Sequence, residues 1–244
     1  MRPTFSMGKP PISKPNELLQ MIADDWNAIR NFNTCSWSTQ RQLDMLATYQ
    51  RLSSEVEATI VNARGRGAGT EANEWRAGKT LLESVVSELR MWLTLKENDG
   101  SAAWNIFCDA EQYALNARNW LPPDFEPAKD QVEHLRLVER VAFPYQAHFT
   151  SLGAIVGREV CTICESEYGT CDHLAGELYD GYMCASRCEE IKEVLHLAIV
   201  LNPRDKRNRI MNTGGVDPLT GIALRGGAKP KTARRSKGKR KRRK

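Results

Sequence analysis

The chain has 244 residues, of which 41% are hydrophobic and 27% charged, and its net charge at pH 7 is +5. No run approaches the roughly 18 apolar residues of a membrane span, and the N-terminal residues lack the apolar segment of a secretory signal. Five of the seven cysteines lie between positions 161 and 188, which argues against a secreted disulfide scaffold. We therefore expect a cytoplasmic globular protein without a membrane segment.

The charge is divided between two parts of the chain. Residues 225–244 contain twelve Lys or Arg and no acidic residue, which leaves residues 1–224 with a net charge of about −7. Almost no apolar residue follows Leu224, and Gly, Pro, Lys and Arg dominate from position 212. We therefore predict a mildly acidic body and a separate, disordered basic tail over residues 212–244.

Apolar residues recur at helical spacing through most of residues 16–142, after an arm of 15 residues without periodicity. The predicted helices start near Pro15, Thr39, Thr70, Ser101 and Pro127 and end near Asn31, Asn62, Lys96, Trp120 and Val141. The breaks between them carry stop signals such as Asn98-Asp99-Gly100. We predict a bundle of four or five helices. All six tryptophans fall here and should be mainly core residues, the alternative being an aromatic interaction face.

The expected inward stripe of the second helix consists of Leu43, Leu46, Tyr49, Leu52, Val56 and Ile60. In the third helix, Ala77-Gly78-Lys79-Thr80 looks like the end of a phosphate-binding loop. Asn73 stands where that loop needs a glycine, and no strand precedes it. We therefore expect Lys79 on a solvated helix face. Cys108 should be a buried small side chain, and His134 a surface or hydrogen-bonded histidine.

Residues 143–211 differ in character from the predicted helices. Pro144 ends the last helix, and residues 149–160 mix small and β-branched side chains. After Cys188 we expect a short helix or turn over Glu189–Val194 and then a strand up to residue 201, because Asn202-Pro203 closes the apolar run. The predicted fold class is mainly α, with an N-terminal helical bundle, a small zinc-stapled α+β module and the basic tail.

The Cys/His cluster of this module has the spacing C-x2-C-x6-C-x-H, followed by C-x3-C. Zinc prefers four thiolate or imidazole ligands in a tetrahedron. Cys161 and Cys164 form the first pair, and Cys171 and His173 form the favoured second pair because residues i and i+2 of an extended segment point the same way. We predict a zinc site made of these four residues.

Other ligand sets remain open at this point. Cys184 and Cys188 could form the second pair on one helical turn, or either could join Cys171; His148 and His196 are weaker candidates. A structural zinc is favoured over a catalytic one, because the sequence lacks the motifs of zinc deaminases and zinc proteases. Glu165 and Glu167 are the nearby carboxylates that a catalytic zinc would need.

The stretch from Cys161 through Gly176, Tyr179, Gly181 and Cys184, followed by residues 194–203, resembles a zinc-knuckle segment. Such segments occur in uncharacterised bacterial and phage-associated proteins, some encoded near head-assembly genes. The resemblance covers about a fifth of the chain. It implies a metal-binding segment but no activity.

The tail packs positive charge without acidic or aromatic residues, a composition that favours salt-dependent binding to nucleic acid without sequence readout. Its expected phosphate-binding residues are Arg234, Arg235, Lys237, Lys239, Arg240, Lys241, Arg242, Arg243 and Lys244. We expect a non-enzymatic accessory protein that binds a protein partner through its helical body and nucleic acid through its tail. The alternatives are an assembly component of a nucleoprotein or phage particle, and a zinc-dependent nucleic-acid enzyme.

Overall fold

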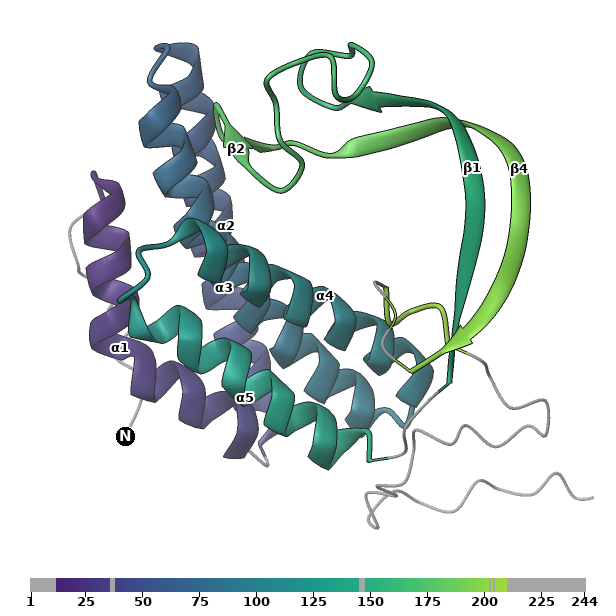
Figure 1. Cartoon of the computed structure of the whole chain (residues 1–244). Helices are drawn as coiled ribbons and strands as arrows, with labels where there is room; N and C mark the ends of the chain where they lie inside the picture. The colour runs from purple at the N-terminus through teal and green to yellow at the C-terminus, as the bar shows by residue number, and fades with distance from the viewer. Residues whose placement is uncertain (1–11, 36–37, 145–147, 202, 204, 210–244) are drawn as a thin grey trace, which may run out of the picture.

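The structure, a computed structural model, describes residues 12–35, 38–144, 148–201, 203 and 205–209 (Figure 1). The predicted arm lies almost entirely outside these residues, and the predicted basic tail with its phosphate-binding residues lies wholly outside them. The described chain forms helices α1 Pro15–Cys35, α2 Thr39–Gly65, α3 Gly69–Lys96, α4 Gly100–Trp120 and α5 Glu126–Ala142, and strands β1 Phe149–Cys161, β2 Leu178–Tyr179, β3 Tyr182–Met183 and β4 Ser186–Val200. The mainly helical class is therefore confirmed.

Helix α3 is the centre of the helical part. It contacts α1, α2 and α4, and most of its residues from Ala77 to Leu89 are buried. Close approach of α1 depends on Gly78, where an added Cβ would lie 2.9 Å from a methyl carbon of Leu18. Trp75 in α3, Trp26 in α1 and Trp104 in α4 are all buried. The prediction that tryptophans belong mainly to the core is therefore correct for these three.

The breaks between helices are formed by the residues that the sequence indicates. The Ser38 side chain accepts a hydrogen bond from the N–H of Arg41 at the start of α2, and Asp99 does the same for Ala102 at the start of α4. Each side chain thus accepts a hydrogen bond from a first-turn N–H group that has no acceptor within the helix. Gly67, with φ of 72°, supplies the left-handed residue between α2 and α3.

The predicted stripe of α2 is wrong at its first position. Leu43 is 44% exposed, whereas Met45 is buried and continues the stripe of Tyr49 and Leu52. Two residues correspond to about 200° around a helix, so Leu43 and Met45 lie on opposite faces. The inward face of α2 therefore includes Met45, which the predicted stripe omitted.

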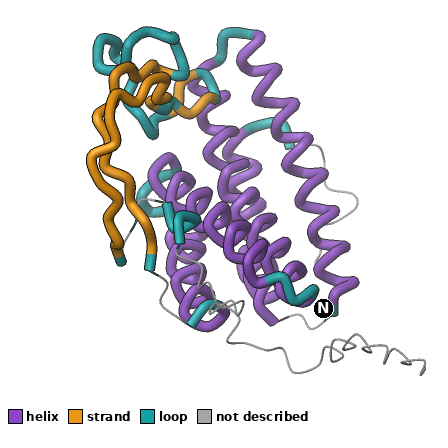
Figure 2. Tube along the Cα trace, turned by 90° about the vertical axis from the view of Figure 1, so that its right-hand side faces the viewer, coloured by secondary structure: helices purple, strands orange, loops and turns teal. Residues whose placement is uncertain are grey.

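Strands β1 and β4 form a long antiparallel ribbon (Figures 1 and 2). It stands beside the helices and is joined to them at both ends. At its base, Phe149 packs against Trp104, with ring centroids 6.3 Å apart, and Lys206 just beyond β4 forms ion pairs with Glu111 and Glu139 at 2.8 and 2.9 Å. The expected helix or turn over Glu189–Val194 is wrong, because β4 begins at Ser186 and runs through it. No helix occurs among the described residues after α5.

One face of the ribbon is an exposed apolar ladder. Register and strand alternation place four cross-strand pairs on the face opposite Phe149. These pairs are Thr150–Ile199, Leu152–Leu197, Ala154–Val194 and Val156–Ile191. Leu197 and Ile199 are 66% and 67% exposed. A two-stranded ribbon of this kind has little core of its own, so its course depends on how its two ends are held.

Among the described residues, none of the helices combines the length and the apolar character that a membrane span requires.

Candidate metal centre

The four residues predicted to bind metal come together at the far end of the ribbon. Cys161 is the last residue of β1, and Cys164, Cys171 and His173 lie in the loop that connects β1 to β2. Their ligand atoms all lie within 4.8 Å of one another. One tetrahedral ion bound through bonds of about 2.0–2.3 Å has its ligands at comparable mutual separations. The cluster could therefore hold a metal ion.

The C-x2-C turn is shaped to stabilise a thiolate at Cys161. The N–H of Glu165 donates to the carbonyl of Cys161 at 2.9 Å, which closes the turn, and the N–H of Ile163 donates to the Cys161 sulfur at 3.4 Å. Burial of this thiol raises its pKa, but the N–H groups of Cys164 and Ile163 and the Cys184 side chain outweigh burial and lower the pKa to about 7. A lowered pKa favours the thiolate form that metals bind.

His173 is held in place by aromatic and backbone contacts. Its ring meets Tyr179 edge to face, with centroids 4.6 Å apart, and the Tyr179 hydroxyl accepts a hydrogen bond from the N–H of Leu174 at 2.9 Å. The Nδ1 atom of His173 is buried and has no hydrogen-bond partner among the described residues. A buried nitrogen without a partner is costly, and coordination of a metal would satisfy it.

The structure separates the two alternative ligands. Cys184 is buried, and its sulfur lies 3.7 Å from that of Cys161. Burial and the neighbouring Cys161 raise the pKa of Cys184 to about 11. Cys188 is exposed, and its thiol donates to the carbonyl of Glu190. Four residues of extended chain span about 13 Å, so the alternative pair of Cys184 and Cys188 on one helical turn is wrong, and Cys188 is not in the cluster.

The two other histidines weighed as ligands lie elsewhere. His148 is exposed just before β1, and His196 lies in β4 opposite Gly153, where its ring occupies the space that a Cβ would take. Neither belongs to the described metal cluster. The carboxylates Glu165 and Glu167 are exposed, and neither is among the four grouped ligands.

Hydrogen bonds from helix side chains to main-chain groups fix the module to the helices. From here on, the module means residues 162–185, which connect β1 to β4. Asn73 of α3 accepts from the N–H of Gly181 at 2.6 Å and donates to the carbonyl of Leu178 at 3.1 Å. Trp120, at the end of α4, donates from Nε1 to the carbonyl of Gly176 at 2.7 Å. The sequence carries no signal for these contacts, because the partners of both side chains are main-chain groups of a distant segment.

Two arginines at the C-terminal end of α2 form contacts within the structure. Arg64 stacks over the Tyr182 ring, 3.7 Å from its centroid, and Arg66 pairs with Glu71 at 3.2 Å. Gly181 itself touches α2 and α3, since an added Cβ would lie 2.9 Å from Ile60. The end of α2 and the start of α3 therefore form a docking surface for residues 181–182.

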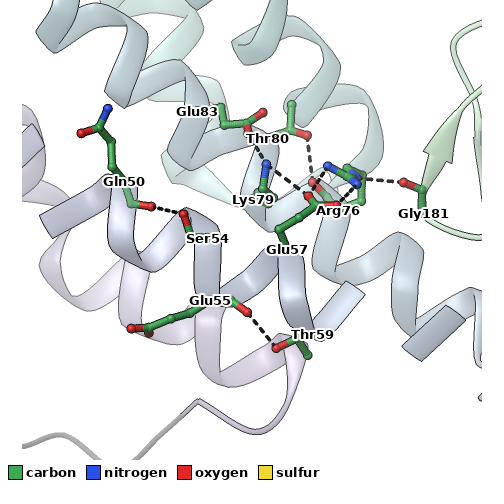
Figure 3. A network of polar contacts seen from close by, with 10 residues as sticks. All are labelled: Gln50, Ser54, Glu55, Glu57, Thr59, Arg76, Lys79, Thr80, Glu83 and Gly181. Atoms are coloured by element: carbon green, nitrogen blue, oxygen red, sulfur yellow. Dashed lines mark hydrogen bonds and ion pairs between the residues drawn. The ribbon is translucent and has the colours of Figure 1, made fainter. Parts of the chain in front are cut away.

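An ion-pair network lies beneath this contact (Figure 3). Arg76 binds Glu57 through both terminal nitrogens at 2.9 and 3.0 Å and donates from Nε to the carbonyl of Gly181 at 2.8 Å. Lys79 pairs with Glu57 at 3.4 Å and also with Glu83. Lys79 is 7% exposed, so the expected solvated position is wrong. Its amine neutralises two carboxylates inside a helix pair.

Comparison of the chain with protein-family models, with curated proteins and with solved structures found no match.

Proposed function

We propose that Cys161, Cys164, Cys171 and His173 hold one structural zinc ion, and that this protein is a zinc-stabilised, non-enzymatic accessory protein. The observation that carries the proposal is the convergence of these four ligand atoms to within 4.8 Å of one another. Three thiolates and one imidazole are a donor set typical of zinc.

A structural role follows from the number of donors. Catalytic zinc keeps one position for water or substrate, whereas structural sites are closed by four protein ligands. The cluster supplies four ligands without Glu165 or Glu167. Zinc would also stabilise a loop that buries few side chains, since most residues from 162 to 177 are exposed. Coordination would join the end of β1 to a loop with little core of its own.

Bound zinc would also affect the position of the ribbon. The module is hydrogen-bonded to α3 and α4 and carries one end of β1 and β4. A zinc that fixes the module would thereby hold the ribbon, with its apolar ladder, in one position. A contiguous exposed apolar patch favours a protein partner. Trp26, Trp75 and Trp104 are buried, so we place the contact with a partner protein on the ribbon in preference to the helical body.

Nucleic-acid binding by residues 225–244 completes the proposal and is supported by their charge alone. The alternative is an assembly component of a nucleoprotein or phage particle, in which the tail neutralises packaged nucleic acid. A zinc-dependent nucleic-acid enzyme is the third possibility, and it would need an open coordination position.

Metal analysis of the purified full-length chain tests the zinc proposal. We expect about one zinc per chain, because one closed tetrahedral site takes one ion. A Cys161→Ser/Cys164→Ser variant should lose the zinc, and Cys188→Ser should retain it because its sulfur lies outside the cluster. A chain that contains no zinc when purified from zinc-supplemented cells would refute the proposal.

A further inference from the structure

A fifth possible donor lies next to the four grouped ligands, one more than a tetrahedral ion can use. Besides the four grouped ligands, Cys184 places its sulfur 3.7 Å from the Cys161 sulfur. Two thiolates on one tetrahedral zinc, with bonds of about 2.3 Å, are separated by about 3.8 Å. The two sulfurs are therefore already at the spacing of ligands that share an ion.

The position of Cys184 is set by the backbone on both sides. Its N–H donates to the carbonyl of Glu177, and its carbonyl accepts from the N–H of Gly176, both at 2.8 Å. The next residue, Ala185, accepts at its carbonyl from the N–H of Thr162 at 3.0 Å and donates its own N–H to the Thr162 hydroxyl at 2.8 Å. Because Thr162 follows Cys161 directly, strand pairing brings the two sulfurs together.

Burial divides the five donors into two groups. Cys161 and Cys184 are 0% and 1% exposed, whereas Cys164 is exposed and Cys171 and His173 are half-buried. The sulfurs of Cys161 and Cys184 thus lie on the buried side of the site. The loop carries the other three donors on the solvent side. His173 is the only nitrogen donor of the cluster.

We infer that Cys184 is a reserve ligand of the metal centre, able to take the fourth coordination position when His173 does not occupy it. The resting site would have three thiolates and one imidazole, and the reserve site four thiolates. Such an exchange keeps the ion closed off from water when the loop that carries His173 moves. This inference rests on the proposed zinc site.

Cobalt(II) substitution tests the inference, since the sulfur-to-cobalt charge-transfer absorption reports the number of bound thiolates. Cobalt(II) is titrated into the reduced, metal-free full-length chain. For His173→Ala we expect one tetrahedral cobalt per chain, with charge-transfer intensity raised from three thiolates to four and a Kd close to that of wild type. Cys184→Ser should keep the wild-type spectrum, which also shows that this variant folds.

The double variant His173→Ala/Cys184→Ser should bind cobalt at least about 100-fold more weakly than His173→Ala. The matched control His173→Ala/Cys188→Ser should behave as His173→Ala alone. A His173→Ala spectrum of three thiolates, or a double variant that binds as tightly as His173→Ala, would overturn the reserve role alone. Failure of the wild-type chain to bind tetrahedral cobalt would overturn the zinc site as well, so the two failures are distinguishable.

Discussion

At the scale of single residues, several polar side chains are more deeply buried than their chemistry suggests. Glu88 of α3 is fully buried, and its carboxylate accepts from Gln131 at 3.0 Å and lies 2.8 Å from Nε2 of His134. His134 is thus a buried, hydrogen-bonded histidine. Of the two positions expected for it, on the surface or in a hydrogen bond, the second is found. Buried polar groups are tolerated only when such partners are present, so these residues tie α5 to α3.

Replacing Glu88 tests this tie. Glu88→Ala leaves His134 and Gln131 buried without their acceptor, and we expect it to lower the free energy of unfolding by about 3 kcal/mol or more. Glu74→Ala, at an exposed position of the same helix, should change it by less than about 0.5 kcal/mol. Urea denaturation measures both. A Glu88→Ala chain as stable as the Glu74→Ala chain would show that the buried network contributes nothing.

The network at Glu57 predicts a pH dependence. Partial burial raises the pKa of Glu57, but the hydrogen bond and charge of Arg76 and the charge of Lys79 outweigh it, so the net pKa lies below the usual 4.5. A group whose folded-state pKa is lowered stabilises the fold above its unfolded pKa and loses that contribution as pH falls through the folded value.

Glu57→Gln should therefore be less stable than wild type at pH 7, and the difference should shrink as the pH falls below about 4.5. Urea midpoints of the two chains at several pH values measure it. Thr59→Ala, which removes a methyl group and an uncharged hydroxyl bonded within α2, should show no such convergence. A stability difference that shrinks nowhere below pH 4.5 would contradict the role given to these ion pairs.

At the scale of elements, what the sequence predicts depends on the range of the forces involved. Helix starts and stops follow from local signals such as Ser38, Asp99 and Gly67, and all five helices are found near their predicted positions. The C-x2-C-x6-C-x-H spacing likewise brings its four residues together, because the ligand positions are close in sequence.

Longer-range features were missed. The ribbon pairs residues 149–161 with residues 186–200. The apolar run from residue 194 predicts the end of β4, but no local pattern shows that its charged start is extended by pairing. The burial of Lys79 depends on Glu57, more than twenty positions earlier. Tertiary partners override local propensity in both cases.

Gly181 tests the docking of the module onto the helices. It has φ of +75°, and an added Cβ would lie 2.9 Å from Ile60, so Gly181→Ala combines backbone strain with a clash. Gly169 has φ of +93° with nothing within 4 Å, which makes Gly169→Ala a matched control for strain alone. We expect Gly181→Ala to be the less stable by about 1–3 kcal/mol.

Hydrogen exchange locates the effect. In Gly181→Ala, amides of β2 and β3 should exchange faster while those of α5 remain protected, because the clash lies at the α2–α3 surface. Equal exchange in the two glycine variants would show that Gly181 is not a contact of the docked module.

At the scale of the whole molecule, the chain combines an anchored ribbon with a tail of opposite charge to the body. Twelve cations over residues 225–244 release counterions from a polyanion, so binding should weaken steeply as salt increases. Deletion of residues 225–244 should abolish most binding to a fluorescent single-stranded oligonucleotide at low salt. Fluorescence anisotropy measures the loss.

The matched control keeps the helices and the metal site intact. The deleted chain should retain its zinc, which shows that the body is folded. Full-length protein should bind oligonucleotides of different sequence with similar affinity, since phosphate contacts do not read bases. Binding that survives the deletion unchanged would move nucleic-acid recognition away from the tail.

The central claim is that three thiolates and one imidazole hold a zinc ion at the end of the ribbon. Zinc K-edge X-ray absorption of the full-length chain, as purified and reduced, measures this coordination shell directly. We predict about three sulfur neighbours near 2.3 Å and one nitrogen neighbour near 2.0 Å. A shell made only of oxygen and nitrogen, or one that contains a bound water in place of a fourth protein ligand, would contradict it.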